Sequence, residues 1–141
     1  MIYKSNRYFR IWAYIVSHSS LLLRSTMLYS DDEDYSLENS FNIDIEIWDV
    51  AYIGIPVFMY NIEIKEIAID QLPLDIDKNL CEYERRIFEI TTDNKKYYII
   101  SGGLLIATNH WGKEDRIFDN HLDLQHDKII FSTNPIKGHQ S

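Results

Sequence analysis

The chain has 141 residues, of which 45% are hydrophobic, and it carries a formal net charge of −8. A chain of this length can bury a core of its own, and its hydrophobic content excludes a disordered acidic polypeptide. The negative charge disfavours nucleic acid and anionic membrane surfaces as partners. We therefore expect one globular domain over residues 1–141 that binds neither.

The single cysteine, Cys81, excludes a disulfide within the chain and favours a reducing compartment. Residues 11–23 follow basic residues and are largely apolar, as the core of a signal peptide is. However, Ser-His-Ser-Ser interrupts this stretch at residues 17–20, and the stretch is too short to span a bilayer. We expect a cytoplasmic protein.

The N-terminal region predicts a β-hairpin. Residues 8–16 alternate between two faces, residues 17–20 are small or polar, and residues 21–27 are again apolar. Two alternating runs that flank turn-prone residues are typical of paired antiparallel strands. The next segment, up to residue 40, is polar and acidic without an apolar period, which indicates an exposed loop.

Residues 41–48 give the clearest strand signal in the chain. The apolar face consists of Phe41, Ile43, Ile45 and Ile47. The opposite face consists of Asn42, Asp44, Glu46 and Trp48. Strict alternation of this kind predicts a strand with one face in the core and one face in water.

The rest of the chain predicts further short strands. They cover residues 50–55, 62–69, 87–92, 96–101, 104–108 and 128–132. In residues 62–69 the apolar positions change face at Lys65–Glu66, which suggests a bulge. Asp93, Asn94 and Lys95 predict the tip of a hairpin, and Gly102-Gly103 predicts another turn.

Helical periodicity is weak. It permits one or two turns near residues 80–87 and a short helix within residues 113–127. The sequence therefore predicts a mainly β protein, an antiparallel sandwich or partly closed barrel of about eight or nine strands with one or two short helices.

The distribution of charge is the strongest functional signal. Residues 1–24 carry four basic residues and no acid, whereas residues 25–64 carry nine carboxylates and no lysine or arginine. Such a field of one sign attracts basic proteins. We expect the partner-binding residues to be Asp31, Asp32, Glu33, Asp34, Asp44, Glu46, Trp48 and Asp49. Alternatively, these carboxylates serve only as a solvated surface.

Trp48 has a particular place in this hypothesis because it ends the acidic face of residues 41–48. Tryptophan often dominates the binding energy of an interface, although a large aromatic ring is more often buried in the core.

The sequence argues against a metal site. In calcium loops the ligands alternate around a glycine, but Asp31–Asp34 are contiguous and the first glycine is Gly54. His121 and His126 lie among aspartates, but a spacing of five directs their rings apart on a strand or a helix. We expect no metal and no cofactor.

Evidence for catalysis is also weak. Cys81 lies close to Glu82 and Glu84, and negative charge raises the pKa of a thiol. The sequence Ser-His-Ser-Ser at residues 17–20 lacks the context of a nucleophile elbow, and Gly102-Gly103 lacks that of a phosphate loop.

Together these features favour a non-catalytic acidic protein-interaction domain, an inhibitor or immunity-type binder of a basic protein. This composition is compatible with that of small acidic antidote proteins that block cationic toxins. The alternative is a small-molecule-binding or hydrolytic β-barrel with its site among His18, His110, Trp111 and nearby aromatic residues. The sequence does not indicate an oligomeric state.

Overall fold

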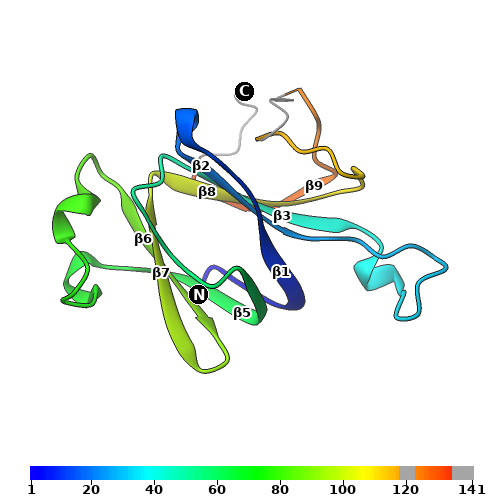
Figure 1. Ribbon diagram of the computed structural model, residues 1–141, viewed down its shortest axis with the longest axis horizontal. Coiled ribbons are helices and arrows are strands. Elements are labelled where there is room, and N and C mark those ends of the chain that lie inside the picture. The colour runs from blue at the N-terminus through cyan, green and yellow to red at the C-terminus, as the bar shows by residue number, and fades with distance from the viewer. Residues whose placement is uncertain (118–122, 135–141) are drawn as a thin grey trace.

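The computed structural model describes residues 1–117 and 123–134. These residues form nine antiparallel strands in one sheet, together with short 3-10 turns (Figure 1). The strands are β1 (Tyr3–Ile15), β2 (Ser20–Ser25), β3 (Asn42–Trp48), β4 (Tyr52–Gly54), β5 (Phe58–Ile67), β6 (Arg86–Thr92), β7 (Lys95–Ser101), β8 (Gly103–Asn109) and β9 (Lys128–Ser132). The mainly β, antiparallel class expected from the sequence is confirmed.

The order of strands across the sheet is β4-β7-β6-β5-β1-β2-β3-β8-β9. β1 has 13 residues and pairs with both β2 and β5, so it joins the two halves of the sheet (Figure 1). The main core contains Phe9 of β1, Ile45 of β3, Ile64 of β5 and Ile99 of β7. The sheet is therefore curved so that both halves contribute to one core, but it does not close into a barrel.

Local patterns explain the two hairpins. β1 and β2 are joined by η1 (Val16–His18), within the hairpin predicted for residues 8–27. At the tip of the β6–β7 hairpin Asp93 and Asn94 have φ values of 55° and 63°. Two successive left-handed residues make the turn that matches the twist of paired strands, and Asn and Asp tolerate this conformation.

The change of face in β5 has a different cause from the expected bulge. Pairing with β6 continues without a shift from Glu63 to Ile67, so the prediction of a bulge at Lys65–Glu66 is wrong. Ile67 instead packs in a second apolar cluster on the other face of the sheet, with Ile87 and Ile100. Both faces are apolar here because residues of the connection from β5 to β6, among them Leu72 and Ile76, cover the outer one.

The turn at Gly102-Gly103 moves the chain from one half of the sheet to the other. β7 pairs with β4 and β6, whereas β8 pairs with β3 and β9. A Cβ atom on Gly103 would lie 2.6 Å from Cζ2 of Trp48, so the close approach of this ring excludes larger residues. The helix expected within residues 113–127 includes residues 118–122, which lie outside the described residues, and the flanking parts form no helix.

Candidate functional site

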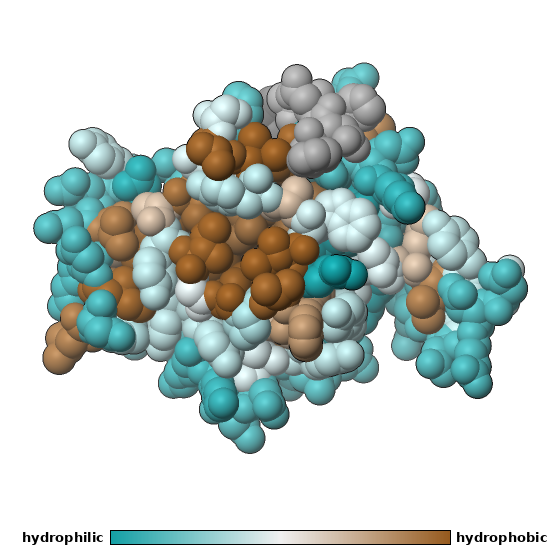
Figure 2. Space-filling model, in the orientation of Figure 1, coloured by the Kyte–Doolittle hydropathy of each residue, from teal (hydrophilic) through white to brown (hydrophobic). Residues whose placement is uncertain are grey.

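The connection from β2 to β3, residues 26–41, forms an acidic loop that projects from the sheet. It is the pale blue and cyan segment at the right of Figure 1, and most of its surface is hydrophilic in Figure 2. Asp31, Asp32, Glu33, Asp34 and Glu38 are all exposed. Within residues 1–117 and 123–134, no ion pair neutralises any of these five carboxylates.

Arg7 of β1 holds the two ends of the acidic loop together. Its guanidinium donates to Ser25 Oγ (3.0 Å) and Ser25 O (3.1 Å) at the end of β2. It also donates to Phe41 O (2.7 Å) and Glu38 O (3.3 Å) at the other end of the loop. The planar guanidinium suits this role because its five donors point in fixed directions.

Hydrogen bonds within the acidic loop order its backbone. The Leu28 amide donates to Asn39 O (2.8 Å), and the Asn39 side chain accepts from the Ser36 amide (2.7 Å) and donates to Asp34 O (3.1 Å). The Tyr29 amide donates to Asp32 Oδ2 (2.6 Å). The loop therefore presents its carboxylates on an ordered backbone, which lowers the entropy that binding would cost.

Asp44 and Glu46 of β3 are buried, so the solvated face that the sequence predicted for β3 is wrong. Asp44 is fully buried and Glu46 is 5% exposed. The chain between β8 and β9 covers this face, and we call its described residues, 110–117 and 123–127, the covering segment. A period of two identifies the two faces of a strand but not what packs on the second face.

Asp44 forms a bidentate ion pair with Arg24 of β2. Arg24 Nε lies 2.7 Å from Asp44 Oδ1, and Arg24 Nη2 lies 2.9 Å from Oδ2. Asn109 of β8 donates to Asp44 Oδ2 (3.0 Å), and the Trp12 ring lies 4.8 Å from the guanidinium carbon of Arg24. Burial raises the pKa of Asp44, and the Arg24 guanidinium and the Asn109 amide offset part of this effect.

The covering segment is attached to the sheet through polar groups. Arg24 donates to Glu114 O (2.9 Å), and Asn42 donates to Trp111 O (2.7 Å). The Asp127 amide donates to Thr108 O (2.8 Å). These contacts add hydrogen bonds for polar groups on β2, β3 and β8 beneath the covering segment.

Glu46 lies in a second charged group under the covering segment. Its carboxylate oxygens are 3.6 Å from Arg116 Nη1 and 3.3 Å from His126 Nε2. Arg116 Nη1 also donates to His126 Nε2 (3.0 Å), and the Trp111 ring packs on His126 with centroids 5.0 Å apart. Glu46 and His126 are 80 positions apart in the sequence, and no local signal links them.

Trp48 and Asp49 lie at the other end of β3 from the acidic loop. Trp48 is half-buried and packs against Gly103. The Asp49 side chain is partly exposed and pairs with Arg85 (3.2 Å). The eight predicted residues thus occupy three places, namely the exposed loop, the buried face of β3 and the far end of β3.

Two histidines of the alternative small-molecule site, His18 and His110, lie far apart. His18 lies in η1, beside the start of β2, whereas His110 follows β8 at the end of the sheet where β2 finishes. The length of β2 therefore separates them, about 20 Å at 3.3 Å per residue. His110 is exposed and pairs with Asp127 (2.5 Å). His121 lies outside the described residues.

Other site chemistry is not assembled in the described part of the chain. Residues 1–117 and 123–134 contain no group of three His, Cys, Asp or Glu side chains placed to hold a metal ion. Burial, and secondarily Asp77, raises the pKa of the Cys81 thiol, which disfavours the reactive thiolate. No helix in those residues is long and apolar enough to cross a membrane.

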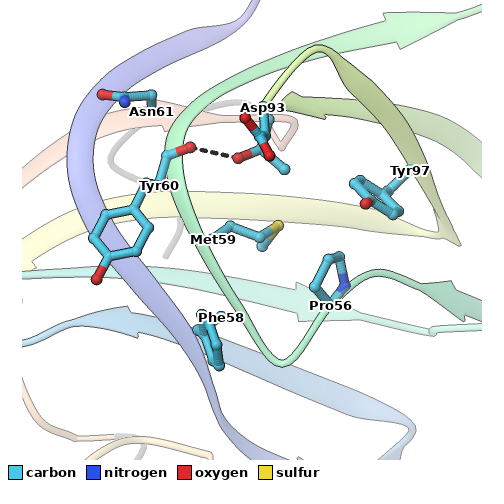
Figure 3. Close-up of a pocket in the computed structure, with 8 residues that line it drawn as sticks. Pro56, Phe58, Met59, Tyr60, Asn61, Asp93 and Tyr97 are labelled. Atoms are coloured by element: carbon cyan, nitrogen blue, oxygen red, sulfur yellow. Dashed lines mark hydrogen bonds between the residues drawn. The ribbon is translucent and has the colours of Figure 1, made fainter.

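Two open pockets flank β5 and β1. One, of about 360 Å³, is lined by Pro56, Met59, Asp93 and Tyr97 among others, and Figure 3 shows Met59 pointing towards Tyr97. The other, of about 320 Å³, lies at the base of the acidic loop and includes Tyr8 and Leu28. Comparison of the chain with protein-family models, curated proteins and solved structures finds no match.

Proposed function

We propose that this protein is a non-catalytic interaction domain whose acidic loop docks on a basic protein, as an inhibitor or immunity-type binder does. The observation that carries the proposal is the ordered, projecting loop with exposed carboxylates at Asp31–Asp34 and at Glu38. Five unneutralised charges in one loop would attract a cationic surface and accelerate association.

The proposed docking surface is smaller than the acidic segment, residues 25–64, that the sequence indicated. Asp44 and Glu46 are buried and Asp49 pairs with Arg85. The unneutralised negative charge of residues 25–64 is therefore concentrated in the loop. Exposed charges change association rates and their salt dependence more than they change dissociation. The mechanism is therefore electrostatic steering by the loop, followed by contacts of other residues.

The experiment compares the natural chain with a variant in which the four tip carboxylates are neutralised, Asp31→Asn, Asp32→Asn, Glu33→Gln and Asp34→Asn. Proteins retained by each immobilised chain from an extract of its own cells are identified by mass spectrometry. We expect basic proteins to be retained by the natural chain and lost from the variant.

The kinetics then test the mechanism with the purified partner. Association should slow by more than tenfold between about 0.05 and 0.5 M salt, because the Debye length shrinks over this range. If the two chains retain the same proteins, or if the association rate does not depend on salt, the loop contributes to solubility alone.

A further inference from the structure

A cluster of exposed aromatic rings lies on the outer face of β1 and β5. Tyr8, Phe58 and Tyr60 are 36%, 56% and 56% exposed. Tyr8 pairs across the strands with Tyr60, and their ring centroids are 4.8 Å apart, while those of Tyr8 and Phe58 are 5.9 Å apart. We call these three residues the aromatic cluster.

The aromatic cluster is not part of the core. Phe9 and Met59, the neighbours of these residues along the strands, point into the main core and are 0% and 2% exposed. Figure 3 shows the Tyr60 ring on the side of β5 that faces β1, away from Met59. Three large rings on the solvent side of a sheet have the composition of the energetically dominant part of an interface.

The aromatic cluster adjoins the acidic loop. Tyr8 and three residues of the loop, Thr26, Leu28 and Asn39, line the same pocket of about 320 Å³. Arg7 also lines it, but its N–H groups are directed at Ser25, Glu38 and Phe41. The exposed rings thus lie at the base of a loop that carries unneutralised carboxylates. Arginine suits such a surface, because the charge attracts it and its guanidinium stacks on aromatic faces.

We infer that the aromatic cluster is the platform on which arginine side chains of the basic partner dock after the acidic loop has attracted them. This inference rests on the proposed function and replaces Trp48 as the aromatic anchor. Trp48 lies half-buried at the opposite end of β3, so it does not share a surface with the loop.

The test uses two fluorescent probes of equal charge, nona-arginine and nona-lysine, and measures their dissociation constants by anisotropy. The aromatic variant is Tyr8→Thr, Phe58→Thr and Tyr60→Thr, in which the β-branched threonine retains strand propensity. The control is Tyr83→Asn, because Tyr83 is 82% exposed and lies outside the surface, and asparagine tolerates its φ of 65°. Thermal unfolding of each variant checks its fold.

We expect the natural chain to prefer nona-arginine, and the aromatic variant to lose about tenfold in affinity for it but less than twofold for nona-lysine. Neutralising the four tip carboxylates should weaken the binding of both probes by a similar factor. If that change weakens both but the aromatic variant binds like the natural chain, the platform is overturned and the proposed function stands. Equal losses for the two probes in the aromatic variant, or the same loss in Tyr83→Asn, also overturn the platform. If binding depends neither on the loop carboxylates nor on the salt concentration, both the platform and the proposed function are overturned.

Arg10 offers a test by gain of binding. It is exposed and lies directly across from Phe58, so it repels a cation at the platform. We expect Arg10→Glu to raise the affinity for nona-arginine about threefold or more at low salt. No change, or weaker binding, would place the docking site elsewhere.

Discussion

At the scale of single residues, Arg24 and Asp44 form the most deeply buried ion pair in residues 1–117 and 123–134. Both side chains are fully buried, and two hydrogen bonds join them. Removing two charges from water is costly, and their mutual attraction compensates only while both partners are present. The pair therefore contributes little net stability compared with apolar residues, but the loss of one partner is severe.

We predict that Asp44→Asn lowers the free energy of unfolding by about 3–5 kcal/mol, because Arg24 keeps a buried charge without its counterion. Urea denaturation followed by circular dichroism measures the change. Glu66→Gln is the control, since it breaks the half-exposed Arg86–Glu66 pair and should cost less than about 1 kcal/mol. Equal effects of the two substitutions would contradict this account of the buried pair.

At the scale of elements, the acidic loop and the covering segment differ in the contacts that fix them to the sheet. The acidic loop buries few side chains and depends on Arg7 and on its own hydrogen bonds. The covering segment is attached through groups on β2, β3 and β8 and encloses charged residues. The two connections meet the same end of the sheet, because Asn42, which follows the loop, pairs with Asn109, which precedes the segment.

We predict that Arg7→Lys loosens the acidic loop without unfolding the sheet. One ammonium group cannot contact both Ser25 and Phe41 in the geometry of the guanidinium. Hydrogen exchange should become faster at the Leu28 amide, which donates to Asn39 O, while the β6–β7 hairpin keeps its protection. Unchanged exchange at Leu28, or a uniform increase over the chain, would show that Arg7 does not specifically order the loop.

At the scale of the whole molecule, the two halves of the sheet share one core. Ile45 and Ile106 from one half pack in the same cluster as Ile64 and Ile99 from the other. β1 contributes Phe9 to this cluster and pairs with both halves. Neither half retains its buried surface when the other unfolds, which favours one cooperative transition.

We predict coincident urea transitions by tryptophan fluorescence and by far-ultraviolet circular dichroism. Trp12 reports on the outer face near Arg24, and circular dichroism reports on all strands. Because the main core cannot persist in one half alone, both signals should have the same midpoint and slope. Separate midpoints would mean that the halves unfold independently despite their shared core.

The local pattern of residues predicted most of the strands. Alternation in residues 41–48 placed Ile43, Ile45 and Ile47 on one face, and these three residues are buried in the main core. Asp93 and Asn94 marked the tip of the β6–β7 hairpin because few other residues accept positive φ. The exposure of Asp31–Asp34 could also be predicted, since adjacent carboxylates cannot be desolvated together.

Tertiary structure decided the environment of the second face of each strand. Asp44 and Glu46 have the sequence pattern of a solvated face, but residues more than sixty positions later cover them. The second apolar cluster also depends on contacts between distant segments.

The sequence by itself thus determined the strand class, the main hairpins and the acidity of the loop, because these depend on neighbouring residues. The tertiary structure decided which charges are buried and which aromatic residues adjoin the loop, because burial depends on what the rest of the chain places against each face.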